Sequence, residues 1–401
     1  MIRSISLILA IGLSLSVTET YEQVSENGYV LAFLLFAIPL IATIVVLLSK
    51  HTAARISIAV TVILFSWLIA LLGMSWLYHV RLVTGDLILV DEIVAVLPPI
   101  IFLVALWWFT SPIGNKISWV LHRLRFDVLM LLLIVLFILG IQEVEESTGD
   151  FGFVWLAILL LFYALAPLYF LTILPTSRIK EGAVKNAITQ VASNAGIKKP
   201  NIYILHTHYK ILNALAYGLL FQRKFVLFSD KLLRDLTQSE VVAVARHEFA
   251  HHKFMHTTFL WLTFVCVMLW VFYFTEVAGV ELHFLALKST KWICAIIAFV
   301  LVSRQFEKQA DTYAVVDFAR TSGSDIVTED AANSMAKALQ AIAFLNGHSP
   351  QRRDYLHGSI SKRQQYLRSL VGSPLLKIPI NTRVRFIKIG ILSLLVLRFI
   401  V

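Results

Sequence analysis

Two histidines and a glutamate in the middle of the chain have the spacing of a metal-binding helix. In His247-Glu248-Phe249-Ala250-His251 the imidazoles are four residues apart, so on a helix they lie about 40° from each other and face one point. Two imidazoles so placed suit two ligands of a zinc ion. Glu248 can act as the general base that takes a proton from water as it attacks a peptide carbonyl. The motif predicts zinc-assisted hydrolysis of peptide bonds.

A catalytic zinc site also needs a third protein ligand and one open position. The best candidate is Glu307, which directly follows two later apolar runs. Asp311 is one helical turn further on and on the same face, where it can orient a ligand imidazole through its distal nitrogen. The sequence therefore predicts one Zn²⁺ per chain, held by His247, His251 and Glu307.

The segments around the motif predict the elements that must position it. Thr237-Gln238-Ser239-Glu240 is a capping box, so a helix is expected to begin near Gln238 and to carry the motif in its interior. A helix over 179–194 is expected to end at Asn194-Ala195-Gly196. Strands are expected at 201–205 and 224–228.

The composition excludes an ordinary soluble enzyme. Of 401 residues, 58% are hydrophobic and 15% are charged, whereas soluble domains average about 45–50% and about 25%. The 2 cysteines, Cys266 and Cys294, are too few for a disulfide framework or a four-thiolate zinc site. This is the composition of a protein largely surrounded by lipid.

Apolar runs near the length needed to cross a bilayer recur along the chain. We expect spans at 29–48, 56–78, 93–110, 128–142, 153–174, 257–277 and 285–302. The run at 5–17 is expected to be a first span, with a signal peptide as the alternative. The apolar run at 386–401 is short and contains Lys388 and Arg398, so it is either interfacial or spanning.

Charges in the connecting segments predict the orientation. The first, third and fifth connections are acidic, and the second, fourth and sixth are basic. Because Lys and Arg near span ends face the cytoplasm, everything after residue 175 is expected on the cytoplasmic side of a plasma, inner or ER-type membrane. The formal net charge of +10 fits contact with anionic lipid headgroups better than with nucleic acid.

The expected fold class is mainly α, a polytopic helical membrane protein with a small α+β metallopeptidase domain at its cytoplasmic face. Residues 1–175 would form an N-terminal membrane domain of about six helices. The catalytic domain would comprise 176–256 and 303–385, separated by a transmembrane hairpin at 257–302 and followed by the apolar helix 386–401.

As an ordered set, these motifs resemble the HtpX and type I CAAX prenyl protease class of integral-membrane zinc metallopeptidases. That class carries His-Glu-x-x-His, a transmembrane hairpin, and then Glu-x-x-x-Asp, which correspond to 247–251, 257–302 and 307–311. Its Asn-Ala-x-Ala-x-Gly segment corresponds to 213–218, and His357-Gly358-Ser359 with Arg363 resembles its His-Pro-Ser and Arg element. The resemblance extends over about 180–370.

The resemblance implies further roles. Asn213 and Ala216 would lie on an edge strand that pairs with substrate backbone. His357 and Arg363 would be catalytic residues near the scissile carbonyl, where a donor stabilises the oxyanion. Two residues depart from the class pattern, Ala250 in place of Gly and Gly358 in place of Pro.

Two further histidines follow the motif. On one continuous helix, His252 lies about 100° from His251, and His256 about 180° from His247. We therefore expect both to be polar residues where the helix approaches the membrane and not ligands. The antirepressor-sensor metalloproteases, which have a similar membrane layout, usually carry Asp at the position of His256.

The expected function is membrane-embedded zinc endopeptidase activity on membrane-associated substrates. Two modes remain open, which are quality-control cleavage of membrane proteins and CAAX-type processing of lipidated C-terminal peptides. The long N-terminal membrane domain resembles the prenyl protease type more than HtpX. The alternative outside enzymology is an inactive membrane scaffold or sensor with a relic metal site.

Overall fold

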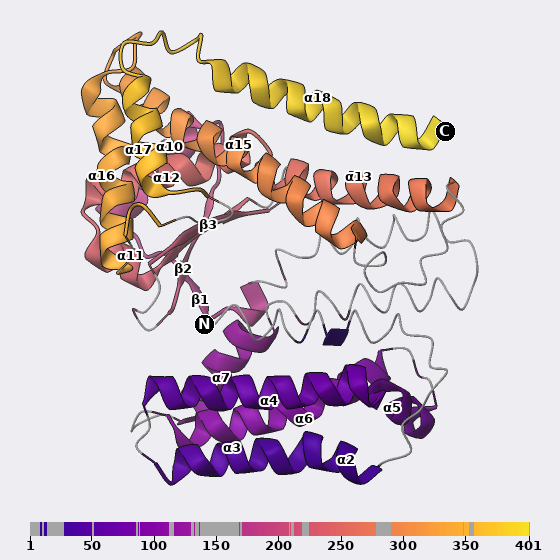
Figure 1. The fold of residues 1–401 in the computed structure, drawn as a ribbon. Coiled ribbons are helices and arrows are strands. Elements are labelled where there is room, and N and C mark those ends of the chain that lie inside the picture. Colours follow the sequence, from indigo (N-terminus) through magenta and orange to yellow (C-terminus); the bar gives the residue numbers. More distant parts are fainter. Residues whose placement is uncertain are drawn as a thin grey trace. The chain divides into compact units, whose positions relative to one another are not determined.

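The structure is a computed structural model, and it divides into two compact units, Met1–Phe162 and Tyr163–Val401 (Figure 1). It describes residues 9, 12, 13, 28–49, 52–85, 87, 89–111, 116–129, 132, 136, 168, 171–207, 209, 212–218, 224–277, 290–347, 349–352 and 357–400. The predicted spans at 5–17, 128–142 and 153–174 lie mostly outside these residues and stay predictions.

The first unit is helical throughout its described part. Its elements are α2 (Gly28–Ala32), η1 (Phe33–Ala37), α3 (Ile38–Leu47), α4 (Ala53–Gly73), α5 (Trp76–Thr84), α6 (Val90–Phe109), α7 (Lys116–Arg123) and η2 (Leu124–Leu129). The run expected as one span at 56–78 is divided between α4 and α5, because Ser75 adopts a left-handed conformation with φ of 51°.

Helix α6 contains Pro98 and Pro99, which changes the hydrogen bonds of its first half. Proline has no N–H, so the carbonyl of Ala95, four residues before Pro99, loses its usual partner. The indole N–H groups of Trp67 and Trp76 donate to that carbonyl at 2.8 Å and 3.0 Å. These indoles tie α4 and α5 to α6 at the proline pair.

Three described helices are long and apolar enough to cross a membrane, namely Gly28–Leu47, Ala54–Gly73 and Val90–Phe109. Helix α12 and the start of α13 meet the same criterion only as a pair, and they are bent by 49°. Many large apolar side chains on these helices are exposed, including Phe33, Phe65 and Ile101. Exposed apolar bands of this kind are suited to lipid, which indicates a membrane protein.

The second unit contains a small four-stranded sheet. Its strands β1 (Thr176–Arg178), β2 (Asn201–Leu205), β3 (Ala214–Tyr217) and β4 (Phe225–Ser229) lie in the order β1-β2-β4-β3. Strands β2 and β4 are parallel, and the outer strands pair antiparallel with them. Strand β3 therefore forms one edge of this sheet.

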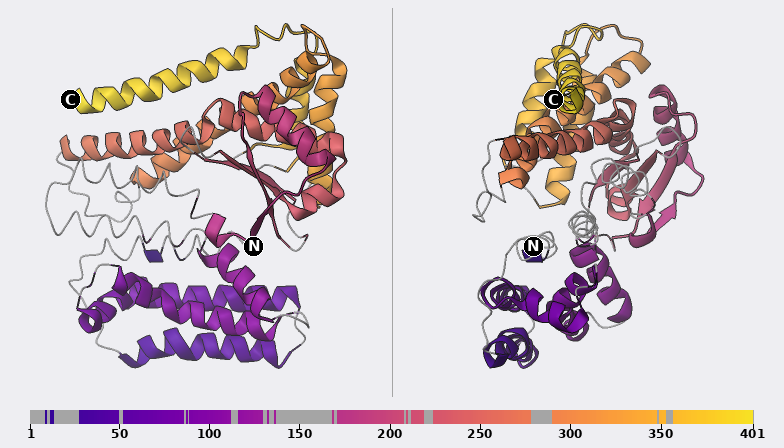
Figure 2. Two further views of the ribbon diagram at one scale, coloured as in Figure 1. Left: turned by 180° about the vertical axis from the view of Figure 1, so that it is seen from behind. Right: turned by 90° about the vertical axis from the view of Figure 1, so that its right-hand side faces the viewer.

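The remaining described elements of the second unit are helices. They are α10 (Ala183–Asn194), α11 (Asp230–Asp235), α12 (Gln238–Lys253), α13 (His256–Val277), α15 (Thr290–Thr321), α16 (Glu329–Leu345), α17 (Ile360–Ser369) and α18 (Pro379–Ile400). Helix α13, the first part of α15 and α18 project together away from the sheet (Figure 2). The mainly helical fold with a small sheet is confirmed.

Helix α12 begins as the capping box predicts. The Thr237 hydroxyl accepts from the Glu240 amide, and the Glu240 carboxylate accepts from the Thr237 amide at 2.9 Å. The helix ends at Lys253, and Met255 has φ of 54° before α13 starts at His256. This break separates the helix that carries the motif from the apolar helix after it.

Candidate active site

Helix α12 brings the two motif histidines onto one face. The Nε2 atoms of His247 and His251 are 3.1 Å apart, and His247 is buried. Both rings therefore direct the same nitrogen toward one point, as the four-residue spacing requires. His252 faces elsewhere, because its Nε2 lies 2.8 Å from the Phe225 carbonyl on β4.

Glu307 reaches this point from α15. Its Oε2 lies 3.5 Å from Nε2 of His247, and its Oε1 lies 3.5 Å from Nε2 of His251. Ligand atoms of His247, His251 and Glu307 all lie within 4.8 Å of one another. Burial favours a raised pKa for Glu307, but the contacts with the two imidazoles outweigh it and hold the pKa well below its usual range. The carboxylate is therefore the charged form that a cation needs.

The donor set fits a zinc ion. Two imidazole nitrogens and one carboxylate, with a fourth position left for substrate, are typical of catalytic zinc sites. The buried Oε2 of Glu307 makes no hydrogen bond of good geometry among the described residues; His247 and Arg363 lie 3.5 Å and 3.6 Å from it, so it can still accept a metal ion. A zinc ion held there would act as a Lewis acid and lower the pKa of water.

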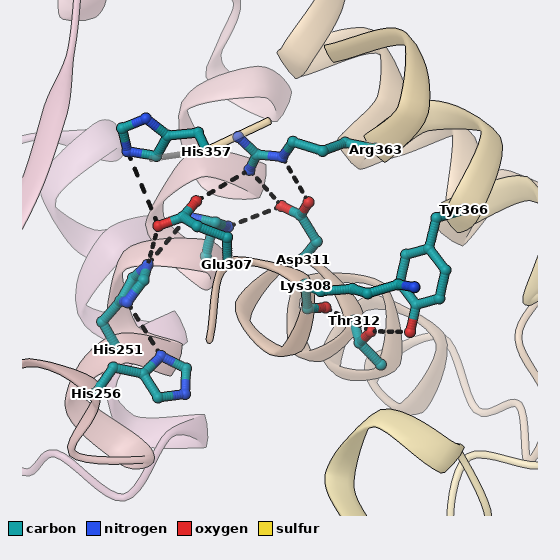
Figure 3. A network of polar contacts seen from close by, with 10 residues as sticks. His251, His256, Glu307, Lys308, Asp311, Thr312, His357, Arg363 and Tyr366 are labelled. Atoms are coloured by element: carbon teal, nitrogen blue, oxygen red, sulfur yellow. Dashed lines mark hydrogen bonds and ion pairs between the residues drawn. The ribbon is translucent and has the colours of Figure 1, made fainter. Parts of the chain in front are cut away.

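Asp311 and Arg363 support the His247 side of the site (Figure 3). Oδ1 of Asp311 lies 2.9 Å from Nδ1 of His247. The Arg363 guanidinium donates to both oxygens of Asp311, at 2.7 Å and 2.6 Å. Burial favours a higher pKa for Asp311, but Arg363 and His247 outweigh it and lower the pKa. A charged carboxylate in this position fixes the ring of His247 and leaves its Nε2 free for a metal.

Glu248 lies next to this cluster and is 8% exposed. Burial raises the pKa of its carboxyl above the usual value; His247 opposes the rise and Glu307 adds to it. The backbone amide of Ala216 faces the Glu248 carboxylate and lowers its pKa in turn. The edge strand β3 and the expected base are thus in direct contact.

His357 lies close to the cluster of His247, His251 and Glu307, whereas Asn213 contacts the neighbouring strand. His357 is half-exposed, and its Nε2 lies 3.9 Å from Oε1 of Glu307. The following Gly358 has φ of +77°, a conformation that proline cannot adopt, which accounts for glycine at this position. Asn213 is exposed just before β3, where its backbone exchanges hydrogen bonds with Ser229. The structure therefore brings Ala216, His357 and Arg363 to the cluster and does not bring Asn213 there.

His256 contacts the site although the sequence places it on the opposite helix face. Its Nδ1 lies 3.1 Å from Nδ1 of His251, as Figure 3 shows. The helix break at Phe254 and Met255 turns His256 back toward α12, and an angle counted along a continuous helix misses this turn. In the sequence, the only sign of this contact is that His256 is a histidine close to two others.

The fold and the site together define a membrane-type metallopeptidase with a His-Glu-x-x-His helix and a distant glutamate. Comparison with known families agrees, because residues 178–329 match the model of peptidase family M48. This region is similar to the M48 metallopeptidases, and the site that it contains is that of a metallopeptidase, an enzyme that hydrolyses peptide bonds. No curated protein matches the chain by sequence.

The fold is also that of a solved structure. The crystal structure of Ste24p from S. mikatae aligns with a TM-score of 0.52 and 13% sequence identity, over 90% of this chain and 98% of that chain. At this identity the likeness establishes the fold alone. It extends well beyond the matched family region, so it includes most of the apolar N-terminal part.

Proposed function

We propose that the chain is a zinc-dependent endopeptidase that cleaves membrane-associated substrates. The observation that carries the proposal is the meeting of His247, His251 and Glu307 within 4.8 Å, beside the buried Glu248, in an M48 domain. The first three would hold one Zn²⁺. Glu248 would take a proton from water and pass it to the leaving amine.

The substrate backbone is proposed to lie along β3. This strand ends the sheet, so its outer edge can pair with an extended chain. Ala216 lies against Glu248, and a peptide in register with β3 would therefore pass the base. Asn213, at the start of the strand, would contact the more distant part of the peptide.

His357 and Arg363 have separate proposed roles. The His357 imidazole is half-exposed and close to Glu307, so it can donate to the oxygen of a scissile carbonyl. Arg363 is bound by both Asp311 oxygens and lies 3.6 Å from Oε2 of Glu307. Its main contribution would be to hold Asp311 and to balance the negative charge of the ligands.

The substrate class is proposed to be lipidated C-terminal peptides, processed in the CAAX manner. Support comes from the extent of the likeness, since 98% of Ste24p aligns with this chain, including the apolar helices that precede the M48 domain. Apolar helices supply a surface for an acyl or prenyl chain. Purified enzyme is expected to cut a farnesylated peptide and to leave its unmodified form intact. Cleavage of unfolded membrane proteins alone would favour the quality-control mode.

The function is tested by two variants of the detergent-purified chain. Glu307→Ala should lose most of the zinc that elemental analysis finds in the wild type, about one per chain. Glu248→Gln should keep zinc and fold but lose cleavage by a factor of at least about 100. Glu329→Ala, an exposed glutamate on α16, is the control and should match wild type. Well-folded wild type without zinc would instead identify an inactive scaffold or sensor.

A further inference from the structure

We propose that His256, Gln309 and Asn381 form a hydrogen-bonded chain that sets the tautomer of His251, so that its Nε2 lone pair faces the metal position. This inference rests on the proposed zinc site. It assigns to three residues on α13, α15 and α18 a positioning role for the second histidine ligand.

The chain of contacts runs outward from the site. Nδ1 of His256 lies 3.1 Å from Nδ1 of His251. Nε2 of His256 lies 2.9 Å from Oε1 of Gln309. The Gln309 amide nitrogen then donates to Oδ1 of Asn381 at 2.9 Å. Each polar atom in this chain has one partner in the next residue.

The direction of the protons follows from Gln309. An amide oxygen can only accept, so Nε2 of His256 must carry its proton. A neutral imidazole has one N–H, so Nδ1 of His256 accepts and Nδ1 of His251 donates. Nε2 of His251 is then bare, and this is the atom that faces Glu307 at 3.5 Å.

If donors and acceptors along these hydrogen bonds were reversed, the site could not bind a metal. If the Gln309 amide were rotated by 180°, its nitrogen would donate to His256, and His256 would then donate from Nδ1 to His251. His251 would carry its proton on Nε2 and could not bind a metal there. In the observed arrangement Oδ1 of Asn381 accepts from the Gln309 nitrogen, so this rotation would require the Asn381 amide to turn as well.

Burial makes the first two partners, His256 and Gln309, hard to replace by water, whereas Asn381 at the outer end is exposed. His256 is fully buried and Gln309 is 4% exposed. The His256 ring stacks on Phe306, with centroids 4.5 Å apart and planes 9° apart, and Phe254 lies 5.7 Å from it. The stacking fixes the plane of the ring, so its two nitrogens keep their partners.

The two histidine ligands are thus supported by different chemistry. His247 faces the charged pair of Asp311 and Arg363, whereas His251 faces a neutral imidazole and two amides. A second carboxylate behind His251 would add negative charge to a buried site that already holds Glu307 and Asp311. The uncharged side chains of His256, Gln309 and Asn381 orient His251 without adding that charge.

The test measures the zinc affinity of the full chain by competition with a chelator. Gln309→Met keeps the volume but removes the acceptor, and we expect zinc affinity to fall about 10–100-fold. In Gln309→Glu the ionised carboxylate can only accept from Nε2 of His256. With His256 neutral this gives the metal-competent tautomer, so the variant should bind zinc more tightly than Gln309→Met. Asn381→Ala should weaken zinc binding less than Gln309→Met, and should have no effect in the Gln309→Glu background.

His252→Phe is the matched control. His252 follows His251 on α12 and is also buried, but it contacts the Phe225 carbonyl and not the metal site. Its zinc affinity should equal that of wild type. Equal affinity of Gln309→Met and wild type would overturn the inference, as would zinc binding by Gln309→Glu that is no tighter than by Gln309→Met. Wild type without zinc would overturn the proposed site itself. Should Gln309→Met fail to fold, the Asn381→Ala pair of measurements decides the question alone.

Discussion

The carboxylate of Asp311 is shared between a metal ligand and a cation. It lies 2.9 Å from His247 and accepts two hydrogen bonds from Arg363. A buried carboxylate without such a partner would tend to take up a proton and lose its hold on the imidazole. Arg363 therefore acts on the metal site through Asp311, from a helix later in the chain.

Arg363→Lys is expected to weaken the enzyme although it keeps the charge. A lysine ammonium is a point donor and cannot bind both Asp311 oxygens in the same plane. We expect kcat/KM to fall about 10–100-fold, with a parallel loss of zinc affinity. Arg368→Lys, on the exposed side of the same helix, should have no effect. Unchanged zinc affinity with reduced kcat would instead place Arg363 at the scissile carbonyl.

Sequence reasoning reached the ligand cluster but not its support on the His251 side. His247, Glu248 and His251 follow from one helical spacing, and Glu307 and Asp311 from a second. His256 depends on the break at Met255, and Gln309 and Asn381 depend on how α15 and α18 pack. No local pattern encodes such packing, because glutamine and asparagine are ordinary on any helix.

At the scale of elements, helix α11 fixes the segment that follows β2. Oδ1 of Asp230, at the start of the helix, accepts from the hydroxyl of Thr207 at 2.6 Å and from the Lys231 amide at 2.9 Å. Its Oδ2 accepts from the backbone amides of Thr207 and Tyr209 at 3.0 Å and 3.2 Å. Partial burial favours a raised pKa for Asp230, but these hydrogen bonds outweigh it and lower the pKa below 3.8.

Because the pKa of Asp230 is lowered in the folded state, the stabilisation that Asp230 gives to the fold should depend on pH. The stabilisation is present above the unfolded-state pKa and is lost as pH falls through the lower folded-state pKa. Asp230→Asn should reduce the free energy of unfolding by about 1–2 kcal/mol at pH 7. Thermal melts in detergent should show this difference shrink below about pH 4. Asp325→Asn, at an exposed position before α16, should leave the melting temperature unchanged at both pH values.

Most elements of the second unit were predictable, and the reasons are local. The strands at 201–205 and 225–229 are short apolar runs bounded by polar residues, and the start of α12 is fixed by its capping box. The division of the predicted span 56–78 was not predictable, because it depends on one left-handed residue, Ser75, within an apolar run. Continuous hydropathy hides a break of this kind.

At the scale of the molecule, the apolar hairpin constrains the topology. Helix α13 starts right after the motif helix, and the middle of α15 brings Glu307 to His247 and His251. Because both ends of the predicted transmembrane hairpin meet at one site, we expect them to lie on the same side of a membrane. Helix α18 follows the hairpin, since the Trp270 indole donates to the Leu394 carbonyl at 3.0 Å. This contact places α18 beside α13, and the expectation for 386–401, interfacial or spanning, stays a prediction.

The alternating charge of the connecting segments and the hairpin together predict that both parts of the catalytic domain lie on the same side of the membrane. Positions 199 and 329 should both face the cytoplasm, and position 146, in an acidic connection, should face the opposite side. Single cysteines at these positions, with Cys266 and Cys294 replaced by alanine, would be labelled in sealed vesicles with a membrane-impermeant maleimide. Positions 199 and 329 should react together and position 146 only in vesicles of the other orientation. Labelling of 199 and 329 on different sides would contradict the hairpin, whereas labelling of both from outside would leave the hairpin intact and reverse the orientation inferred from the charges.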